Sequence, residues 1–420
     1  MAGLDHFLKD IAMILLKKLT LLGLISALAA CGGGGGDGYT IPPFWSQTGL
    51  VVADLNGDGR ADVAVASTYI AGPPRHPGYV EVYLQAATGG FGLPVRYPIG
   101  PDPWGMSVGD VDNDGHPDLV VASPSTVPTQ INTINSSGGI SVLRQDPANL
   151  GRFLTSQWVS TGGLAEDVAV AHLDGDGRPD LVVSDAIAVN ARAMVLYQNK
   201  AASGEFSTPI DLPTGSGSED VAVADINGDG LADIVLAASS SVVVFYQRVG
   251  GGVEAPRLLA AGLKAQGVAA ADLDGDGRTD IVAANAGNAP DGGTGGASAT
   301  VLLQTSPGGF VATQIPVADG ARRVAIADLN GDGIPDIALV SIVYQALSTP
   351  AKISVLLQSA AVRGQFTAVN TYNGALNASF IAIGDINNDG RNDIILNDGP
   401  AMLVQRSGAP GVFDAVQALR

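Results

Sequence analysis

The stretch "ADLNGDGRAD", residues 53–62, places Asp54, Asn56, Asp58 and Asp62 within nine positions. The same pattern occurs six more times, at 109–118, 171–180, 224–233, 271–280, 327–336 and 384–393. Successive copies are 47 to 62 residues apart. Repeats with a period of this size are typical of solenoids, propellers and other arrays built from one recurring unit. The chain is therefore expected to consist of seven such units, numbered here in chain order.

Each acidic turn lies between two short apolar runs rich in β-branched residues, such as 49–55 and 62–67 in the first unit. This pattern favours strands over helices. A third strand follows and ends in glutamine in every unit: Gln85, Gln145, Gln198, Gln247, Gln304, Gln358 and Gln405. A fourth strand begins after a glycine-containing turn. Seven four-stranded units predict an all-β, seven-bladed β-propeller, whereas an open linear array would leave exposed edge strands at both ends.

The acidic turn has the pattern D-x-[DN]-x-D-G-x-x-D, which matches the oxygen ligands that Ca²⁺ prefers. Positions 1, 3 and 5 would direct side-chain oxygens inward, position 7 would offer a backbone carbonyl, and position 9 a final carboxylate. Glycine at position 6 allows the sharp bend. The pattern is not an EF-hand, because position 12 is Val65 and strands flank the turn. An ordinary hairpin turn is the alternative, but a hairpin does not require acids at positions 1 and 9.

Up to seven calcium sites are therefore expected between the first and second strands of the units. The ligands would be Asp54, Asn56, Asp58, Arg60 and Asp62; Asp110, Asp112, Asp114, His116 and Asp118; Asp174, Asp176, Arg178 and Asp180; Asp225, Asn227, Asp229, Leu231 and Asp233; Asp272, Asp274, Asp276, Arg278 and Asp280; Asp328, Asn330, Asp332, Ile334 and Asp336; Asp385, Asn387, Asp389, Arg391 and Asp393, with position 7 contributing its backbone carbonyl. The second and fifth units carry four carboxylates each and should bind most tightly. The third site should be weak or empty, because its first position is His172.

The turns of the "DLNGDGRAD" type, combined with fourth strands that begin Gly-Phe, resemble FG-GAP/VCBS repeats. Such repeats form the propeller of integrin α subunits and occur in many bacterial surface proteins. The resemblance covers about residues 47–420. It implies calcium bound between the first and second strands of each blade, and it specifies neither a ligand nor an activity.

The N-terminal segment resembles a bacterial lipoprotein signal. Two lysines precede the apolar run 19–30, and "LAAC" (28–31) resembles a lipobox, which implies cleavage before Cys31 and attachment of lipid to it. Gly32 after the cysteine favours the outer membrane, and a plain signal peptide is the alternative. We divide the chain into a signal peptide at 1–30, with its start at Met1 or Met13, a glycine-rich tether at 31–38 and the propeller at 39–420.

Charge and composition argue against two classes of function, nucleic-acid binding and catalysis. The formal net charge of −19 argues against nucleic-acid partners. After the signal, the chain has only His76, His116 and His172 as histidines, and it has no G-x-S-x-G motif or zinc spacing, so catalysis has little support. Two carboxylates clustered with a basic residue at the channel mouth would instead favour an enzyme, such as a polysaccharide lyase or hydrolase.

Partner binding is expected on the face opposite the calcium turns, where long, variable second-to-third loops gather. These loops span 67–78, 123–139, 285–298 and 341–352. The links between blades add candidate partner-binding residues near the channel mouth: Trp104, Glu166, Asp167, Glu219, Asp220, Arg322 and Arg323. We expect a monomeric binding module for a protein or a glycan. A structural or assembly role in the cell envelope is the further alternative.

Overall fold

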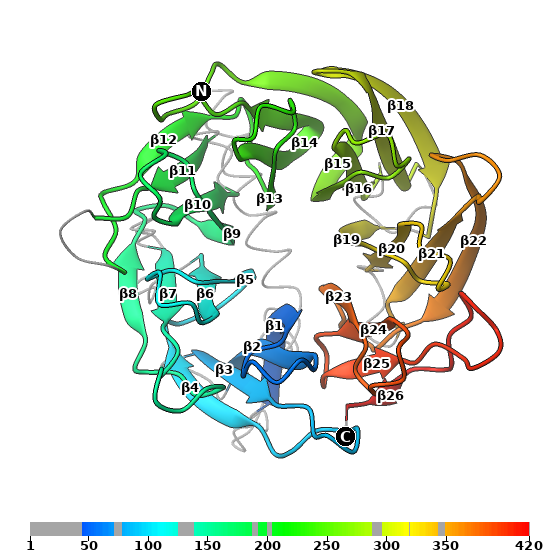
Figure 1. Cartoon of the computed structure of the whole chain (residues 1–420), viewed down its shortest axis with the longest axis horizontal. Coiled ribbons are helices and arrows are strands. Elements are labelled where there is room, and N and C mark those ends of the chain that lie inside the picture. The colour runs from blue at the N-terminus through cyan, green and yellow to red at the C-terminus, as the bar shows by residue number, and fades with distance from the viewer. Residues whose placement is uncertain are drawn as a thin grey trace, which may run out of the picture.

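The computed structural model of the chain is an all-β molecule whose sheets are arranged in a ring (Figure 1). It describes residues 44–70, 78–124, 138–186, 192–199, 204–287, 296–318, 320–342 and 349–419. Within these ranges no residue is helical. No helix of the described part is long and apolar enough to cross a membrane. The predicted signal peptide, Cys31 and the tether lie outside the described residues.

Five of the six sheets have four antiparallel strands in chain order, which confirms the predicted four-stranded repeat. They are β1 (Phe44–Ala53), β2 (Asp62–Ile70), β3 (Gly78–Tyr83) and β4 (Val95–Ile99); β5 (Met106–Gly109), β6 (Asp118–Ser123), β7 (Gly139–Leu143) and β8 (Gln157–Ser160); β9 (Ala165–Ala171), β10 (Asp180–Asp185), β11 (Arg192–Leu196) and β12 (Ile210–Pro213); β19 (Ala321–Ala327), β20 (Asp336–Ser341), β21 (Lys352–Gln358) and β22 (Phe366–Asn373); and β23 (Ile381–Gly384), β24 (Asp393–Leu396), β25 (Ala401–Leu403) and β26 (Gln417–Ala418). The first strand of each of these sheets lies nearest the centre of the ring (Figure 1).

The sixth sheet has six strands and contains the strands of the fourth and fifth units. It comprises β13 (Asp220–Ala224), β14 (Asp233–Phe245), β15 (Arg257–Ala271), β16 (Asp280–Asn285), β17 (Ser298–Ser306) and β18 (Gly309–Pro316). Positive backbone φ angles of 47° at Ser239 and 56° at Lys264 bend β14 and β15 where their registers shift. Each long strand thus continues two strands of the repeat through a bend, because the connections there are very short.

The core lies between neighbouring sheets and is built from small aliphatic side chains. The second strands β6, β10, β16 and β20 are buried along their whole length. One cluster joins Val182 and Val195 of the third unit to Leu236 and Val243 of the fourth. A second strand that is covered on both faces needs a continuous apolar run, which explains why these segments lack polar alternation.

Among the described residues, no strand is exchanged between the first and last sheets, a point that the sequence left open. In this part of the chain the first sheet is formed by β1–β4 and the last by β23–β26. The seam between them is joined by Asn397, whose Nδ2 donates to the carbonyl of Gln47 at 2.9 Å. The Gln85 Nε2 donates to the carbonyl of Asp385 at 3.2 Å. Hydrogen bonds from side-chain amides to backbone carbonyls therefore join the first and last units at this seam.

Asn397→Ala should open this seam. Asn397 is fully buried, and its Oδ1 also accepts from the N–H groups of Ser379 at 2.8 Å and Phe380 at 2.9 Å. Leaving these groups unpaired should cost about 2–4 kcal/mol of unfolding free energy. Hydrogen exchange should accelerate selectively in β1 and β23. Asn285→Ala, which removes a fully buried asparagine at the end of β16 inside the six-stranded sheet, should destabilise without this selectivity; equal exchange in both variants would contradict the account of the seam.

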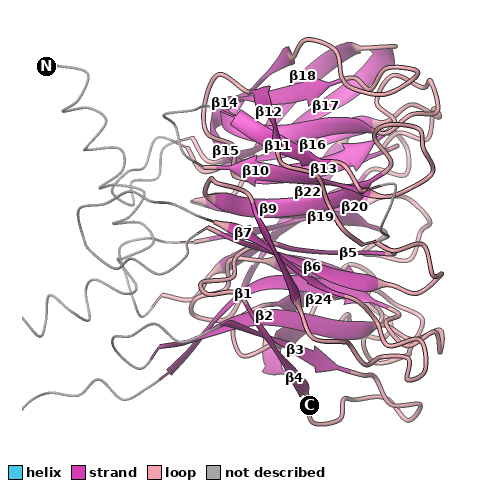
Figure 2. Ribbon diagram, turned by 90° about the vertical axis from the view of Figure 1, so that its left-hand side faces the viewer, coloured by secondary structure: helices cyan, strands magenta, loops and turns pink. Residues whose placement is uncertain are grey.

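The acidic turns and the third-to-fourth connections share one face of the ring, as the strand directions require. In the first unit, Gln85 and Phe91 form a bridge next to the acidic turn, and the Gln85 N–H donates to Asp62. Figure 2 shows the sheets from the side, with the connections gathered at the two ends of the strands. At least half of each predicted partner-binding loop, at 71–77, 125–137, 288–295 and 343–348, lies outside the described residues.

Candidate calcium sites and the channel cluster

The local shape of the acidic turn follows from glycine and from the first aspartate. Gly57 and Gly59 have positive φ angles of 74° and 81°, which residues with a β-carbon rarely adopt. The carboxylate of Asp54 accepts from the N–H of Asp58 at 3.0 Å and of Gly59 at 2.7 Å. The turn is thereby curled around its first side chain, and the side chains at positions 3 and 5 are directed to the same side.

The second and fifth units bring three carboxylates together at positions 1, 3 and 5. Oxygens of Asp110, Asp112 and Asp114 lie within 4.8 Å of one another, as do those of Asp272, Asp274 and Asp276. In the first unit Asn56 takes the third position, and its Oδ1 accepts from the Asp58 N–H at 3.0 Å. The Asp274 Oδ1 accepts in the same way from the Asp276 N–H at 3.2 Å. This set of hard oxygens could hold a calcium ion.

The aspartate at position 9 is a structural residue as well as a candidate ligand. In the first unit Asp62 is fully buried and accepts from the N–H of Leu55 at 3.0 Å and of Gln85 at 2.8 Å. The same two bonds recur in the next five units, at Asp118, Asp180, Asp233, Asp280 and Asp336. Asp393 accepts from the N–H of Gln405 at 2.8 Å. Each carboxylate oxygen has a second lone pair, so these bonds leave room for a metal.

Burial raises the pKa of these ninth-position carboxyls, against the opposing effect of their backbone hydrogen bonds. The pKa of Asp62 rises to about 6, and that of Asp118 to about 7. Asp233, Asp336 and Asp393 behave alike, with pKa values of about 6, 6 and 7. Neighbouring carboxylates of the same turn add to the shift. Without a cation, ionisation of the ninth-position carboxyl therefore lowers the free energy of unfolding.

These shifts predict opposite pH dependences with and without calcium. A carboxyl whose folded-state pKa is raised stabilises the fold below its ordinary pKa of about 4, and this stability is lost as the pH rises through the folded value. In EGTA the melting temperature should therefore fall between about pH 4 and pH 7. Calcium affinity should rise over the same range, because protons compete for the ligands. Melts in EGTA and calcium titrations at several pH values measure both; a melting temperature in EGTA that rises over this range would contradict the prediction.

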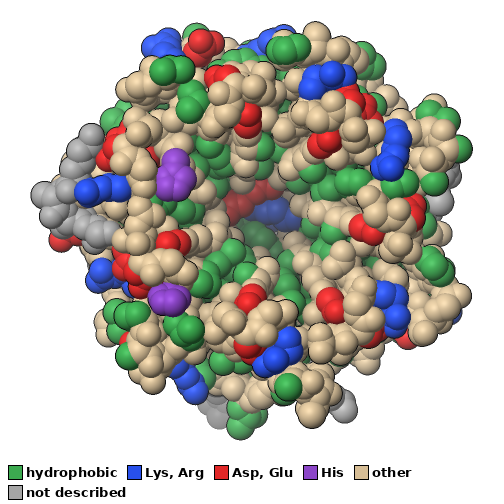
Figure 3. Space-filling view, in the orientation of Figure 1, with side chains coloured by type: hydrophobic (Ala, Val, Ile, Leu, Met, Phe, Trp, Pro, Cys, Tyr) green, Lys and Arg blue, Asp and Glu red, His purple; other side chains and the backbone are tan. Residues whose placement is uncertain are grey.

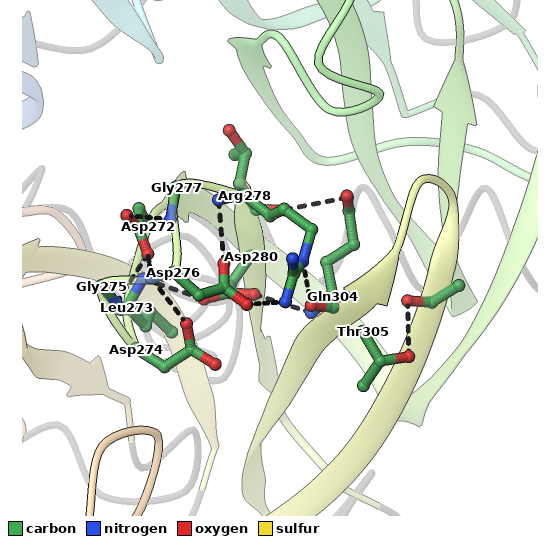
Figure 4. A network of polar contacts seen from close by, with 12 residues as sticks. Asp272, Leu273, Asp274, Gly275, Asp276, Gly277, Arg278, Asp280, Gln304 and Thr305 are labelled. Carbon is green, nitrogen blue, oxygen red and sulfur yellow. Dashed lines mark hydrogen bonds and ion pairs between the residues drawn. The ribbon is translucent and has the colours of Figure 1, made fainter.

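The arginines at position 7 have a side-chain role that sequence reasoning missed. Arg60, Arg278 and Arg391 pair with the carboxylate at position 5 of their own turns, Asp58, Asp276 and Asp389. Figure 4 shows the fifth unit, where the Nε of Arg278 also donates to the carbonyl of Gln304 at 2.9 Å. The arginine therefore ties the acidic turn to the end of the third strand. The recurrence of arginine at position 7 could have indicated this role, although only the backbone carbonyl of position 7 was expected to bind calcium.

The turn of the third unit lacks the acceptor that curls the others. The His172 side chain is exposed, and among the described residues no hydrogen bond joins its ring to the turn. Asp174 and Asp176 keep their places, since the Asp176 N–H donates to Asp174 Oδ1 at 3.0 Å. Three carboxylates remain in this turn, with one ligand position held by an imidazole, which suits calcium poorly.

His172→Asp should therefore create a strong calcium site. The substitution supplies the missing carboxylate and the acceptor for the turn N–H groups, so the variant should bind one more calcium ion per chain than the natural sequence. Isothermal titration calorimetry on calcium-free protein measures the difference. His172→Asn, which adds an acceptor without charge, should have a smaller effect, and an unchanged stoichiometry in His172→Asp would contradict the assignment.

The candidate partner residues are brought together, but most of them are buried in the channel. Glu166, Asp167, Asp220, Arg322 and Arg323 are 2%, 8%, 6%, 9% and 5% exposed. Trp104 and Glu219 are partly exposed. Figure 3 shows the face of the ring in the orientation of Figure 1, with acidic and basic side chains at the bottom of a central hollow. Buried side chains cannot contact a partner without movement, so at most Trp104 and Glu219 present contact surface here.

Arg323 lies at the centre of this channel cluster and contacts four other units. It donates to the carbonyls of Gln266 at 2.6 Å and Glu219 at 3.1 Å. Its guanidinium lies 3.6 Å from Asp167 and 3.8 Å from Asp220. A register shift in β19 turns both neighbouring arginines inward. Burial and a hydrogen bond with Asp220 hold the pKa of Asp167 well above its ordinary value of 3.8, which favours one shared proton in this pair.

Aromatic rings complete the channel cluster. Arg322 lies 5.0 Å from the ring centre of Trp104, and Arg323 lies 4.7 Å from that of Phe380. The two rings meet edge to face at 6.2 Å. Gly105 packs so closely that a β-carbon there would lie 2.1 Å from an oxygen of Asp167. The cluster thus joins the inner ends of several sheets.

Comparison with known families accounts for the repeats. The FG-GAP-like repeat family matches residues 54–121, 184–236 and 225–283, and the FG-GAP repeat family matches 103–143. The chain contains FG-GAP repeats. They are homologous to those of integrin α: "Integrin alpha pat-2" of Caenorhabditis briggsae is 29% identical over 172 residues, and its Caenorhabditis elegans counterpart is 28% identical. Each alignment covers 35% of this chain and 14% of the relative, so the chain matches only a small part of those proteins.

Solved structures support the fold alone. The periplasmic gluconolactonase PpgL of Pseudomonas aeruginosa superposes with a TM-score of 0.54 and 18% identity, over 78% of this chain and 85% of that chain. A putative 6-phosphogluconolactonase of Bacteroides uniformis gives 0.54 and 12%, over 84% and 94%. At such identities the shared feature is the arrangement of sheets, and an activity does not transfer.

Proposed function

We propose that the protein is a non-enzymatic binding module of the bacterial cell envelope, built on a seven-bladed propeller that calcium stabilises. The observation that carries the proposal is the convergence of carboxylate oxygens at positions 1, 3 and 5 of the second and fifth acidic turns, which lie within segments that match FG-GAP-like repeats. Integrin-α-like repeats suggest protein binding, and a glycan is the other partner class.

The blade count rests on the seven acidic turns and on the six-stranded sheet. Five sheets hold one acidic turn each, and β13–β18 hold two, at Asp225–Asp233 and Asp272–Asp280. Counted by turns, the six-stranded sheet is two adjoining blades. The bent strand β14 forms the second and third strands of the fourth blade, and the bent strand β15 joins the fourth blade to the fifth. We therefore propose seven blades, with one candidate calcium site in each and a weak site in the third.

The partner is proposed to bind on the face opposite the acidic turns. The second-to-third loops are long in four units, and variable loops on a rigid scaffold are where binding usually lies. Lipid on Cys31 would hold the module at the outer membrane, and the tether at 31–38 would let that face reach a partner. A monomer would suffice for this function.

Binding of the purified chain to arrays of glycans and of extracellular proteins, in calcium and in EGTA, tests the proposal. We expect a partner that binds in calcium and is lost in EGTA together with the fold. A shortened 123–139 loop should abolish binding without lowering the melting temperature, whereas the same change in the third-to-fourth turn at 86–90 should leave binding intact. Binding that survives loss of the long loops would contradict the assigned face.

An envelope enzyme is the second candidate, because the channel cluster joins two carboxyls and an arginine. We prefer the binding module, since the side chains of Asp167, Asp220 and Arg323 are only 12%, 9% and 6% exposed. The carboxyls also bond to each other, whereas a glycosidase keeps its pair about 5 Å or more apart. Turnover of an acidic polysaccharide that is lost in Asp167→Asn, with an unchanged melting temperature, would support the enzyme instead.

A further inference from the structure

In five of the seven units, the glutamine that ends the third strand connects two acidic turns. In the sixth unit the backbone N–H of Gln358 donates to Asp336 Oδ1 at 2.7 Å. Its side-chain Nε2 donates to the carbonyl of Leu273 at 3.0 Å. Leu273 is position 2 of the acidic turn of the fifth unit, between the candidate ligands Asp272 and Asp274. One residue therefore binds the ninth aspartate of its own unit and the turn of the preceding unit.

A crossing bond of this kind occurs at five of the seven boundaries, to position 2 of the preceding turn at four of them and to position 1 at the seam. Gln304 donates to Ile226 at 2.6 Å, Gln405 to Leu329 at 2.5 Å, Gln358 to Leu273 and Gln198 to Val111, while Gln85 donates to Asp385 at 3.2 Å across the seam. Gln145 bonds instead to Pro117 of its own unit. Among the described residues, no side-chain amide of this set donates to Leu55 or Leu173. The turns of the first and third units thus lack the bond.

The bonds form a continuous buried chain between neighbouring sites. The N–H of Leu273 donates to Asp280 Oδ2 at 2.9 Å, so the chain runs from Asp336 through Gln358 and Leu273 to Asp280. These four residues are at most 4% exposed. A buried chain of this kind transmits the position of one turn to the next, because its members have no water with which to exchange bonds. Units 4, 5, 6, 7 and 1 form an uninterrupted series.

We propose that these glutamines are positioning residues that couple calcium binding between neighbouring turns. This inference rests on the proposed calcium sites. With calcium bound at one turn, the ninth aspartate and the glutamine N–H that it accepts would be held in place. The glutamine side chain would then hold position 2 of the preceding turn, so that ordering the ligands of that turn would cost less entropy. Coupling is reciprocal, and each ion should raise the affinity of its neighbour by about fivefold, the value of one hydrogen bond.

The pair formed by the fifth and sixth sites tests the coupling. The backbone amide of Gly277, which donates to Asp272 Oδ2, reports calcium at the fifth site by nuclear magnetic resonance. Disabling the sixth site with Asp332→Asn should weaken calcium binding at Gly277 by about fivefold. In Gln358→Met, which keeps the backbone N–H and the side-chain volume, Asp332→Asn should change the affinity at Gly277 less than about 1.5-fold.

The control is Gln247→Met, at the matched position of the fourth unit, where the side chain makes no crossing bond. It should leave the fivefold effect of Asp332→Asn intact. If calcium binds at Gly277 and Asp332→Asn has no effect, or has the same effect in Gln358→Met, the coupling is wrong and the calcium sites stand. If no turn amide responds to millimolar calcium, the proposed sites themselves are wrong, and the coupling with them.

Discussion

Chelation of calcium with EGTA should lower the melting temperature of the protein by about 20 °C. Each site filled at a hundredfold excess over its dissociation constant adds roughly 2.7 kcal/mol to the unfolding free energy, so six strong sites add roughly 16 kcal/mol. An unfolding entropy of about 2.1 cal/mol/K per residue, over about 380 folded residues, gives roughly 0.8 kcal/mol per degree. Differential scanning calorimetry with and without calcium measures the shift.

Magnesium is the control for this melt. It demands octahedral geometry and dehydrates reluctantly, so it should restore much less of the melting temperature than calcium at equal concentration. Equal melting temperatures in calcium and in EGTA would show that the acidic turns act only as hairpins.

We expect Asp336→Ala to destabilise the protein strongly even in EGTA, and Asp328→Ala to act mainly when calcium is present. The first substitution removes the acceptor of two buried N–H groups, on Leu329 at 3.0 Å and Gln358 at 2.7 Å. Leaving both unpaired should cost about 2–6 kcal/mol. Asp328 accepts from exposed N–H groups that water can replace, so its loss in EGTA should cost less than about 1 kcal/mol. Urea denaturation in EGTA measures both.

Asp336→Asn is the matched control for this comparison. It keeps an oxygen acceptor and has no charge to desolvate, so in EGTA it should lose less than Asp336→Ala. In calcium, all three variants should lose the contribution of the sixth site. Equal losses for Asp336→Ala and Asp328→Ala in EGTA would contradict the structural role of position 9.

Much of the fold could be predicted from the sequence because its signals are local and repeated. The alternation of acidic turn, short apolar runs and a terminal glutamine specifies four strands wherever it occurs, and five sheets follow it strand for strand. The six-stranded sheet differs because the second-to-third connection of the fourth unit shrinks to a bend at Ser239. A sequence shows the short connection, but the backbone angle decides whether a strand ends there.

The residues of the candidate calcium sites could be predicted from the sequence, but the structural roles of some of them could not. The positions of the seven turns follow from residue types alone. The double role of Asp62 and its counterparts depends on Gln85 and its counterparts, which are 23 residues away in the first unit. The channel residues were expected at the surface because they lie in short links. The convergence of Asp167, Asp220 and Arg323 from three different units is a tertiary fact, which no local pattern reports.

The number of calcium ions bound per chain tests the central claim most directly. Calcium-free protein is dialysed to equilibrium against 0.1–1 mM calcium, and the bound metal is counted by atomic emission. The account predicts about six ions, one for each acidic turn except that of His172, with a seventh only at the upper end of this range. Fewer than one ion per folded chain at 1 mM calcium would contradict it.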